Sequence, residues 1–134
     1  MNCRLSLLLI LVLLAFGCES LRGNQTSSFI DGAGNIIDVE YGQGDEPYKT
    51  TFVSPVNGRK MELESKLRVR VTMPDGQQFI GYQCMHMLAS GTMYKSKNGK
   101  YMFHANGFSA SVFEYEPERD DYRMIYEGAV IRFM

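Results

Sequence analysis

The sequence predicts an all-β protein whose domain is a small antiparallel β-barrel of about eight strands, with a β-sandwich as the alternative. One long segment alternates between apolar and polar residues, turn motifs separate further short segments of the same kind, and no segment has a helical period. So many strands in 134 residues would leave sheet edges exposed, and closing the sheet on itself protects them. The eight Phe and eight Tyr residues suit the interior of either architecture.

The chain begins with a segment that is typical of an export signal. Arg4 is followed by an apolar run over residues 7–16 and then by Gly17 and Cys18. This run of ten residues is much shorter than the ~20 that a membrane-spanning helix needs. We therefore expect residues 1–17 to be a signal peptide that is removed on export.

The end of this signal resembles the lipobox of bacterial lipoproteins, on the residues Leu14-Ala15-Phe16-Gly17-Cys18. The resemblance implies that Cys18 is acylated, becomes the new N-terminus and anchors the protein to a membrane of the cell envelope. Glu19 after the cysteine implies, by similarity to Gram-negative sorting rules, the outer membrane facing the periplasm. Ala15 and Gly17 also suit ordinary signal peptidase, so a soluble secreted or periplasmic protein is the alternative.

Residues 18–35 are polar and rich in glycine, with little to bury. We expect them to form the lipidated N-terminus and a flexible tether. The β-barrel domain would then span residues 36–134.

The expected strands follow one another to the end of the chain. Residues 61–73 form the clearest strand, because their apolar residues fall on alternate positions. Pro74-Asp75-Gly76 turns the chain into a strand over residues 78–88. Asn98-Gly99, expected as a type I′ turn, joins residues 92–96 to residues 100–105. A third hairpin pairs residues 109–116 with residues 122–127, residues 129–133 close the chain, and residues 36–41 and 49–53 are shorter candidates.

Charge and cysteine content exclude some classes of protein. The formal net charge is −1, and removing residues 1–17 takes away one of the 14 basic residues and none of the 15 acidic ones, which leaves −2. Nucleic acid is therefore not an expected partner, because phosphate binding needs a basic patch. With Cys3 removed and Cys18 acylated, Cys84 stands alone and no disulfide is expected; if Cys18 is not acylated, a Cys18–Cys84 pair is the alternative.

The sequence gives little support for catalysis, and we expect neither an enzyme nor a cofactor. His86 and His104 are the two histidines of the chain, and no nucleophile elbow or metalloprotease motif is present. A minor alternative is a Cu(I) site of Cys84, His86, Met102 and His104, because thiolate, thioether and imidazole groups are soft ligands. Core packing explains scattered methionines more simply.

One stretch resembles the membrane-bound inhibitors of c-type lysozyme. It runs from Leu88-Ala89-Ser90-Gly91-Thr92-Met93-Tyr94 through Asn98-Gly99-Lys100-Tyr101-Met102-Phe103 to Gly107-Phe108-Ser109-Ala110-Ser111-Val112, and covers about 25 residues. The resemblance implies a lipoprotein with an eight-stranded antiparallel barrel that binds c-type lysozyme through a Ser-Gly turn. It places the partner-binding residues at Ser90, Gly91, Tyr94, His104 and Gly107.

Two features of the family pattern are absent from this sequence. The family's lysine before the glycine, which enters the lysozyme cleft with the serine, is replaced by the segment His104-Ala105-Asn106-Gly107, and the paired cysteines are missing. Lys95, Lys97 or Lys100 is a candidate to supply the cation instead. Acidic residues between positions 114 and 121 are candidates for a rim that attracts the basic lysozyme. An envelope barrel that binds another ligand or partner, or acts in assembly, is the alternative function.

Overall fold

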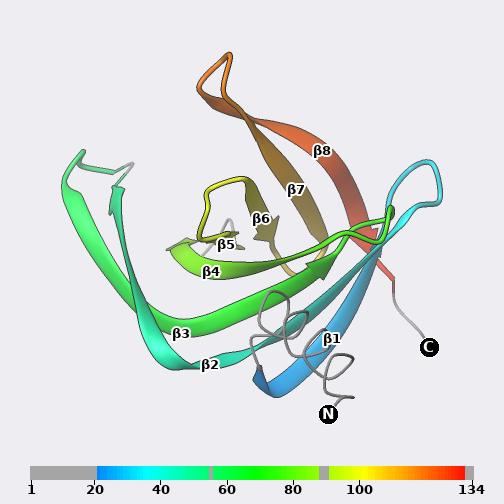
Figure 1. The fold of residues 1–134 in the computed structure, drawn as a ribbon, viewed down its shortest axis with the longest axis horizontal. Helices are drawn as coiled ribbons and strands as arrows, with labels where there is room; N and C mark the ends of the chain where they lie inside the picture. The colour runs from blue at the N-terminus through cyan, green and yellow to red at the C-terminus, as the bar shows by residue number, and fades with distance from the viewer. Residues whose placement is uncertain (1–20, 55, 88–90, 132–134) are drawn as a thin grey trace, which may run out of the picture.

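The computed structural model describes residues 21–54, 56–87 and 91–131, without the side chains of Asn24, His86 and Met87. Eight strands form one antiparallel sheet that closes into a barrel, as the sequence predicts. They are β1 (Arg22–Ile30), β2 (Ile36–Val53), β3 (Lys60–Thr72), β4 (Gln78–Met87), β5 (Gly91–Lys95), β6 (Tyr101–Ala105), β7 (Ser109–Glu116) and β8 (Asp121–Val130). Each strand pairs with the next, and β1 and β8 complete the ring (Figure 1). Within the described residues, no helix is long and apolar enough to cross a membrane.

The expectation that residues 18–35 form a tether is wrong for Arg22–Ile30, which is strand β1. Seven of its residues pair with residues of β2, and this pairing satisfies their backbone hydrogen-bonding groups although the segment is polar. Phe29 is 1% exposed and contributes to the core. The folded domain therefore begins before residue 36, within the segment that the sequence assigned to the tether.

Two further strand boundaries differ from those expected. Residues 36–41 and 49–53 belong to the single strand β2, which continues across a register shift between Gln43 and Tyr48. The expected closing strand is the end of β8 as far as Val130. Residues 132–134 lie outside the described part of the chain.

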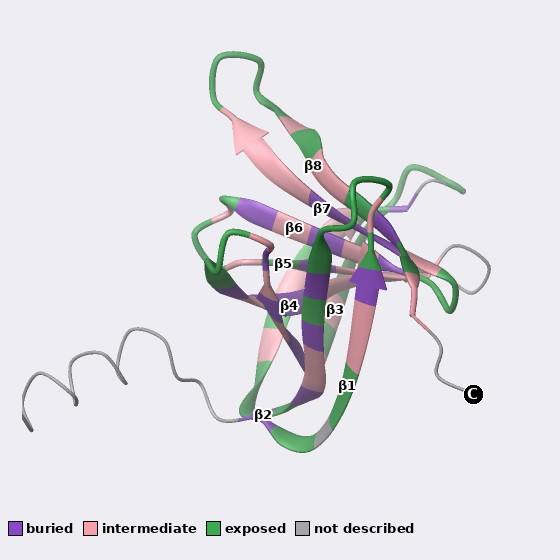
Figure 2. Cartoon of the chain, turned by 90° about the vertical axis from the view of Figure 1, so that its right-hand side faces the viewer, coloured by how far each residue is buried: buried purple, intermediate pink, exposed green. Residues whose placement is uncertain are grey.

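Alternating burial along the strands produces the core. Its fully buried side chains come from five strands and are Phe29, Ile37, Val39, Val69, Val71, Phe103 and Val112. Phe103 lies at its centre, with ring centroids 6.3 Å from Phe29 and 6.2 Å from Tyr94. Figure 2 shows this contrast: buried residues alternate along β6 and gather in the first half of β7, whereas the tip of the β7–β8 hairpin is exposed.

The β5–β6 turn has a geometry different from the expected type I′ turn. Gly99 has a φ of 74°, whereas Asn98 is not among the residues with positive φ, and a type I′ turn needs both. Gly99 N donates to Ser96 O at 2.9 Å, which closes a β-turn over residues 96–99 with glycine in its last position. The Asn98 carboxamide supports it by accepting from Lys100 N.

Candidate functional site

The sequence-predicted partner-binding segments meet at one end of the barrel. Gly91 begins β5 directly after residues 88–90, and its backbone lies against the end of β6. A Cβ atom at Gly91 would lie 2.2 Å from Ala105 O and 3.1 Å from the Cα atom of Asn106, and Gly91 has a φ of 101°. Glycine is needed here for both reasons. Gly91 therefore lies directly against the end of β6 and the start of the β6–β7 turn. Ser90 lies outside the described residues.

The β6–β7 turn holds an exposed aromatic side chain on a well-fixed backbone. The Oδ1 atom of Asn106 accepts from Phe108 N at 2.8 Å and from Ser109 N at 2.9 Å. On the other side, Val130 N donates to Phe108 O at 2.9 Å. The Phe108 side chain is nevertheless 73% exposed. We call the surface formed by Gly91 and the turn residues Asn106, Gly107 and Phe108 the loop face.

Phe108 is a candidate contact residue that the sequence analysis missed. The signal was present, because Asn-Gly followed by a large apolar residue is typical of a turn in which the asparagine caps the backbone. An apolar side chain in such a turn lies outside the strands and is not buried by them. Gly107, which the resemblance assigns to partner binding, belongs to the same turn.

Tyr94 and His104 do not lie together on the loop face. Tyr94 is a core residue, 7% exposed, and its ring faces those of Tyr41 and Phe103. Burial raises the pKa of the Tyr94 phenol. His104 is half-buried and alternates with the buried residues Phe103 and Ala105, so it points to the outside of the barrel. Tyr94 is therefore placed to support the fold rather than to touch a partner.

The candidate lysines lie at the opposite end of β5 and β6 from the loop face. Lys95 ends β5, and Lys97 and Lys100 belong to the following turn. Their ammonium groups lie over aromatic rings: Lys97 Nζ is 4.9 Å from the Tyr82 ring centre, and Lys100 Nζ is 5.3 Å from that of Tyr101. They do not supply the cation that the family pattern places beside the serine.

The expected acidic rim is likewise remote from the loop face. Glu114, Glu116, Glu118, Asp120 and Asp121 lie at the β7–β8 turn. Glu116 at the end of β7 is seven positions after Ser109 at its start, which corresponds to about 24 Å along an extended strand. Glu116 is paired with Arg123 at 3.1 Å. These carboxylates can attract a basic protein from a distance, but they do not border the loop face.

The structure shows where the residues of the expected Cu(I) site lie. Met102 and His104 share the outer side of β6. Cys84 is half-buried and lies at a register shift, where its Sγ atom donates to Met93 O at 3.5 Å. Burial raises the pKa of this thiol, and the ammonium of Lys95 partly opposes that rise. The His86 side chain lies outside the described part, and no group of three His, Cys, Asp or Glu residues suited to a metal occurs within that part.

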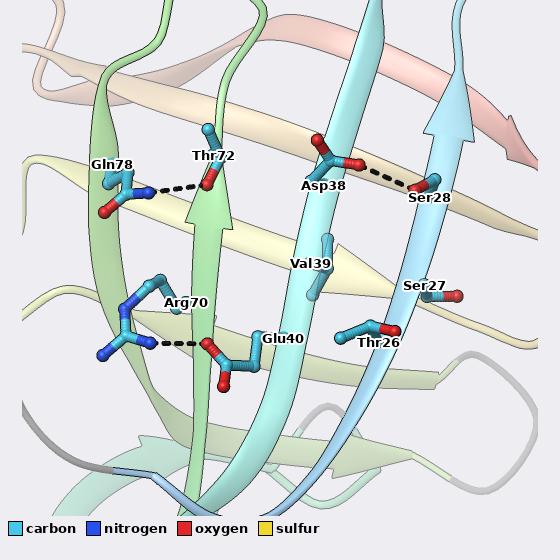
Figure 3. Close-up of a pocket in the computed structure, with 9 residues that line it drawn as sticks. All are labelled: Thr26, Ser27, Ser28, Asp38, Val39, Glu40, Arg70, Thr72 and Gln78. Atoms are coloured by element: carbon cyan, nitrogen blue, oxygen red, sulfur yellow. Dashed lines mark hydrogen bonds and ion pairs between the residues drawn. The ribbon is translucent and has the colours of Figure 1, made fainter.

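Strands β1–β4 carry a polar groove of about 630 Å³ (Figure 3). Its side chains bind one another: Ser28 donates to Asp38 at 2.7 Å, Gln78 donates to Thr72 at 3.0 Å, and Arg70 pairs with Glu40. These cross-strand pairs satisfy the polar side chains on the outer side of the sheet. The groove therefore presents a surface already engaged in internal hydrogen bonds.

Comparison with known proteins identifies no relative. No family model, no curated protein and no solved structure matches this chain. The fold and the loop face define the molecule as a small closed antiparallel barrel with a rigid exposed turn.

Proposed function

We propose that this protein is a non-enzymatic binding module of the bacterial cell envelope, anchored through a lipid on Cys18, that uses its loop face to bind a c-type lysozyme. The observation that supports the proposal is the close approach of Gly91 to Ala105 and Asn106, because it brings the start of β5 beside the segment 104–107. The closed eight-stranded antiparallel barrel also agrees with the architecture that the resemblance implies.

Phe108 is the proposed anchor of this interaction. Aromatic residues held on a fixed backbone contribute much to protein interfaces, because they bury a large area and lose little freedom on binding. Asn106 and Val130 fix both sides of the Phe108 backbone. The Phe108 side chain would enter the lysozyme cleft.

Charge assists the encounter in this proposal without forming the contact. The exported chain carries a net charge of −2, and lysozymes of this class are basic. Complementary charge raises association rates more than it raises affinity. The absence of the family's lysine from the segment 104–107 means that shape and apolar contact, rather than a cation against the catalytic carboxylates, would have to block the cleft.

The proposal is tested by mixing the purified full chain, in non-ionic detergent, with a c-type lysozyme and following the lysis of cell walls. We expect slower lysis at micromolar protein. Phe108→Ser should weaken inhibition by about tenfold, the loss expected for ~1.4 kcal/mol at an interface. Val56→Ser is the matched control, because Val56 is an apolar loop residue that is 91% exposed on another hairpin.

Two results would count against the proposal. Unchanged lysis at micromolar protein would exclude lysozyme inhibition and favour another envelope partner or an assembly role. Equal losses for Phe108→Ser and Val56→Ser would remove the loop face as the binding surface. Acylation of Cys18 is tested separately by mass spectrometry of the mature N-terminus, where an unmodified cysteine would exclude the lipid anchor.

A further inference from the structure

A row of soft donor groups crosses the outside of the barrel on strands β4, β5 and β6. Met85 on β4 is paired with Met93 on β5, and Met93 is paired with His104 on β6. Directly paired residues of adjacent strands have Cβ atoms about 4.5–5.5 Å apart when they share a side of the sheet. The row therefore brings two thioethers and an imidazole within reach of a single small ion.

The three side chains share the outer side because the inner side is fully occupied. Tyr94, Phe103 and Ala105 alternate with them and are buried in the core. Met85 follows the register shift at Cys84, and its direct pairing with Met93 places it on the same outer side. All three are half-buried rather than buried, so core filling does not account for these two methionines.

Two further soft groups border the row. Cys84 is adjacent to it, since its Sγ atom contacts the carbonyl of Met93 at 3.5 Å. Met102 lies two residues before His104 on the same side of β6 and is paired with Lys95. The Lys95 ammonium lies 5.3 Å from the ring centre of Tyr122. Its positive charge on this side of the sheet would repel a bound metal ion.

The donor types identify the ion. Thioether and imidazole groups bind soft monovalent metals such as Cu(I), whereas Mg²⁺ and Ca²⁺ require oxygen ligands. No carboxylate belongs to the row formed by Met85, Met93 and His104. Thioethers carry no proton at any physiological pH, so these two donors are available without deprotonation.

We propose that Met85, Met93 and His104 form a surface Cu(I) site on strands β4–β6, with Cys84 as an adjacent fourth donor. The site differs from the minor alternative that the sequence indicated. The register shift at Cys84 pairs Met85, rather than His86, with Met93 in the row. It uses side chains of the sheet surface and none of the loop-face residues Gly91, Asn106, Gly107 and Phe108.

The test is an anaerobic titration of the full chain in detergent with Cu(I), in competition with the chromophoric chelator bicinchoninate. We expect one Cu(I) to be retained per chain. Loss of a supporting residue around a metal commonly lowers affinity about 10- to 100-fold, so Met93→Leu and His104→Gln, which remove donors, should lower it by about 100-fold. Met61→Leu is the matched control, because Met61 is a 46% exposed methionine on the β2–β3 hairpin.

A second measurement reports the donors directly. Titration with Ag(I), which has the same softness and is not oxidised in air, should shift the methyl NMR signals of Met85 and Met93 and leave that of Met61 unchanged. Failure to retain Cu(I) against bicinchoninate would overturn the proposal. It would also be overturned by equal effects of Met93→Leu and Met61→Leu, or by Ag(I) shifts that spread over all methionines.

Discussion

Strands β2 and β3 contain two regions that share the same backbone pairing but differ completely in burial. Near the start of β2, Ile37 and Val39 are 0% and 2% exposed, whereas Val53 at its other end is 59% exposed. The register shift between Gln43 and Tyr48 separates the two regions. Beyond the shift the two strands continue as a hairpin that curves away from the body of the barrel (Figure 1). We call residues 48–65 the β2–β3 arm.

This difference shows that strand pairing and domain stability are separate properties. The inner region packs against Phe29, Val69 and Val71 across the core, and burial of such side chains is the main source of folding free energy. The β2–β3 arm has cross-strand pairs such as Phe52 with Met61 and Thr50 with Leu63. A two-stranded hairpin without a covered side is marginally stable in water. We therefore expect the free energy of unfolding to depend on the barrel interior and hardly at all on the arm.

The largest expected effect comes from Phe103→Ala in the barrel interior. Phe103 is 0% exposed and lies against the rings of Phe29 and Tyr94. Removing a buried phenyl ring leaves a cavity and costs about 3–5 kcal/mol. Chemical denaturation followed by circular dichroism should show this loss in the free energy of unfolding. A loss below ~1 kcal/mol would mean that the barrel interior is not the stabilising region.

An intermediate effect is expected from the pH dependence of stability. Burial raises the pKa of the Tyr41 phenol above its ordinary value near 10, and the neighbouring Tyr94 adds to this rise. In the unfolded chain both phenols ionise above pH 10, while the folded barrel keeps them protonated. The folded state then binds more protons, so stability is complete below pH 10 and falls as the pH rises further.

The measurement is the free energy of unfolding at pH 9 and at pH 11. The decline should approach about 1.4 kcal/mol per pH unit for each phenol that stays protonated in the folded state. Tyr41→Phe should reduce this alkaline decline, because it removes one of the two groups. An identical decline in the variant would show that Tyr41 does not cause it.

The same comparison explains how much of the fold could be predicted from the sequence. Strand β3 was predicted within one residue at each end, because its alternation combines with the Pro74-Asp75-Gly76 turn. Strand β1 was missed because its positions from Thr26 to Ser28 are polar and only its pairing with β2 and β8 makes it part of the sheet. Pairing with neighbouring strands leaves no signal in the composition of the segment itself.

The candidate site was predictable only in part, for a related reason. Gly91 and Gly107 were assigned to partner binding through the family resemblance, and the structure places Gly91 against the segment that leads into the Gly107 turn. Tyr94 was assigned to the partner-binding surface, but its pairing with Phe103 makes it a core residue. The side of the sheet that a residue occupies depends on register, and the shift at Cys84 is set by tertiary structure.

The smallest expected effect comes from Val53→Thr in the β2–β3 arm. Val53 is paired with Lys60 near the end of the hairpin and is largely exposed, and substitutions at such positions usually change stability by less than about 0.5 kcal/mol. Val69→Thr is the matched substitution in the inner region, where Val69 is 0% exposed. Placing an unpaired hydroxyl there should cost about 1–3 kcal/mol. Equal losses for the two variants would show that the arm unfolds cooperatively with the barrel, whereas hydrogen exchange that is faster in residues 49–53 than in residues 37–41 would locate the boundary at the register shift.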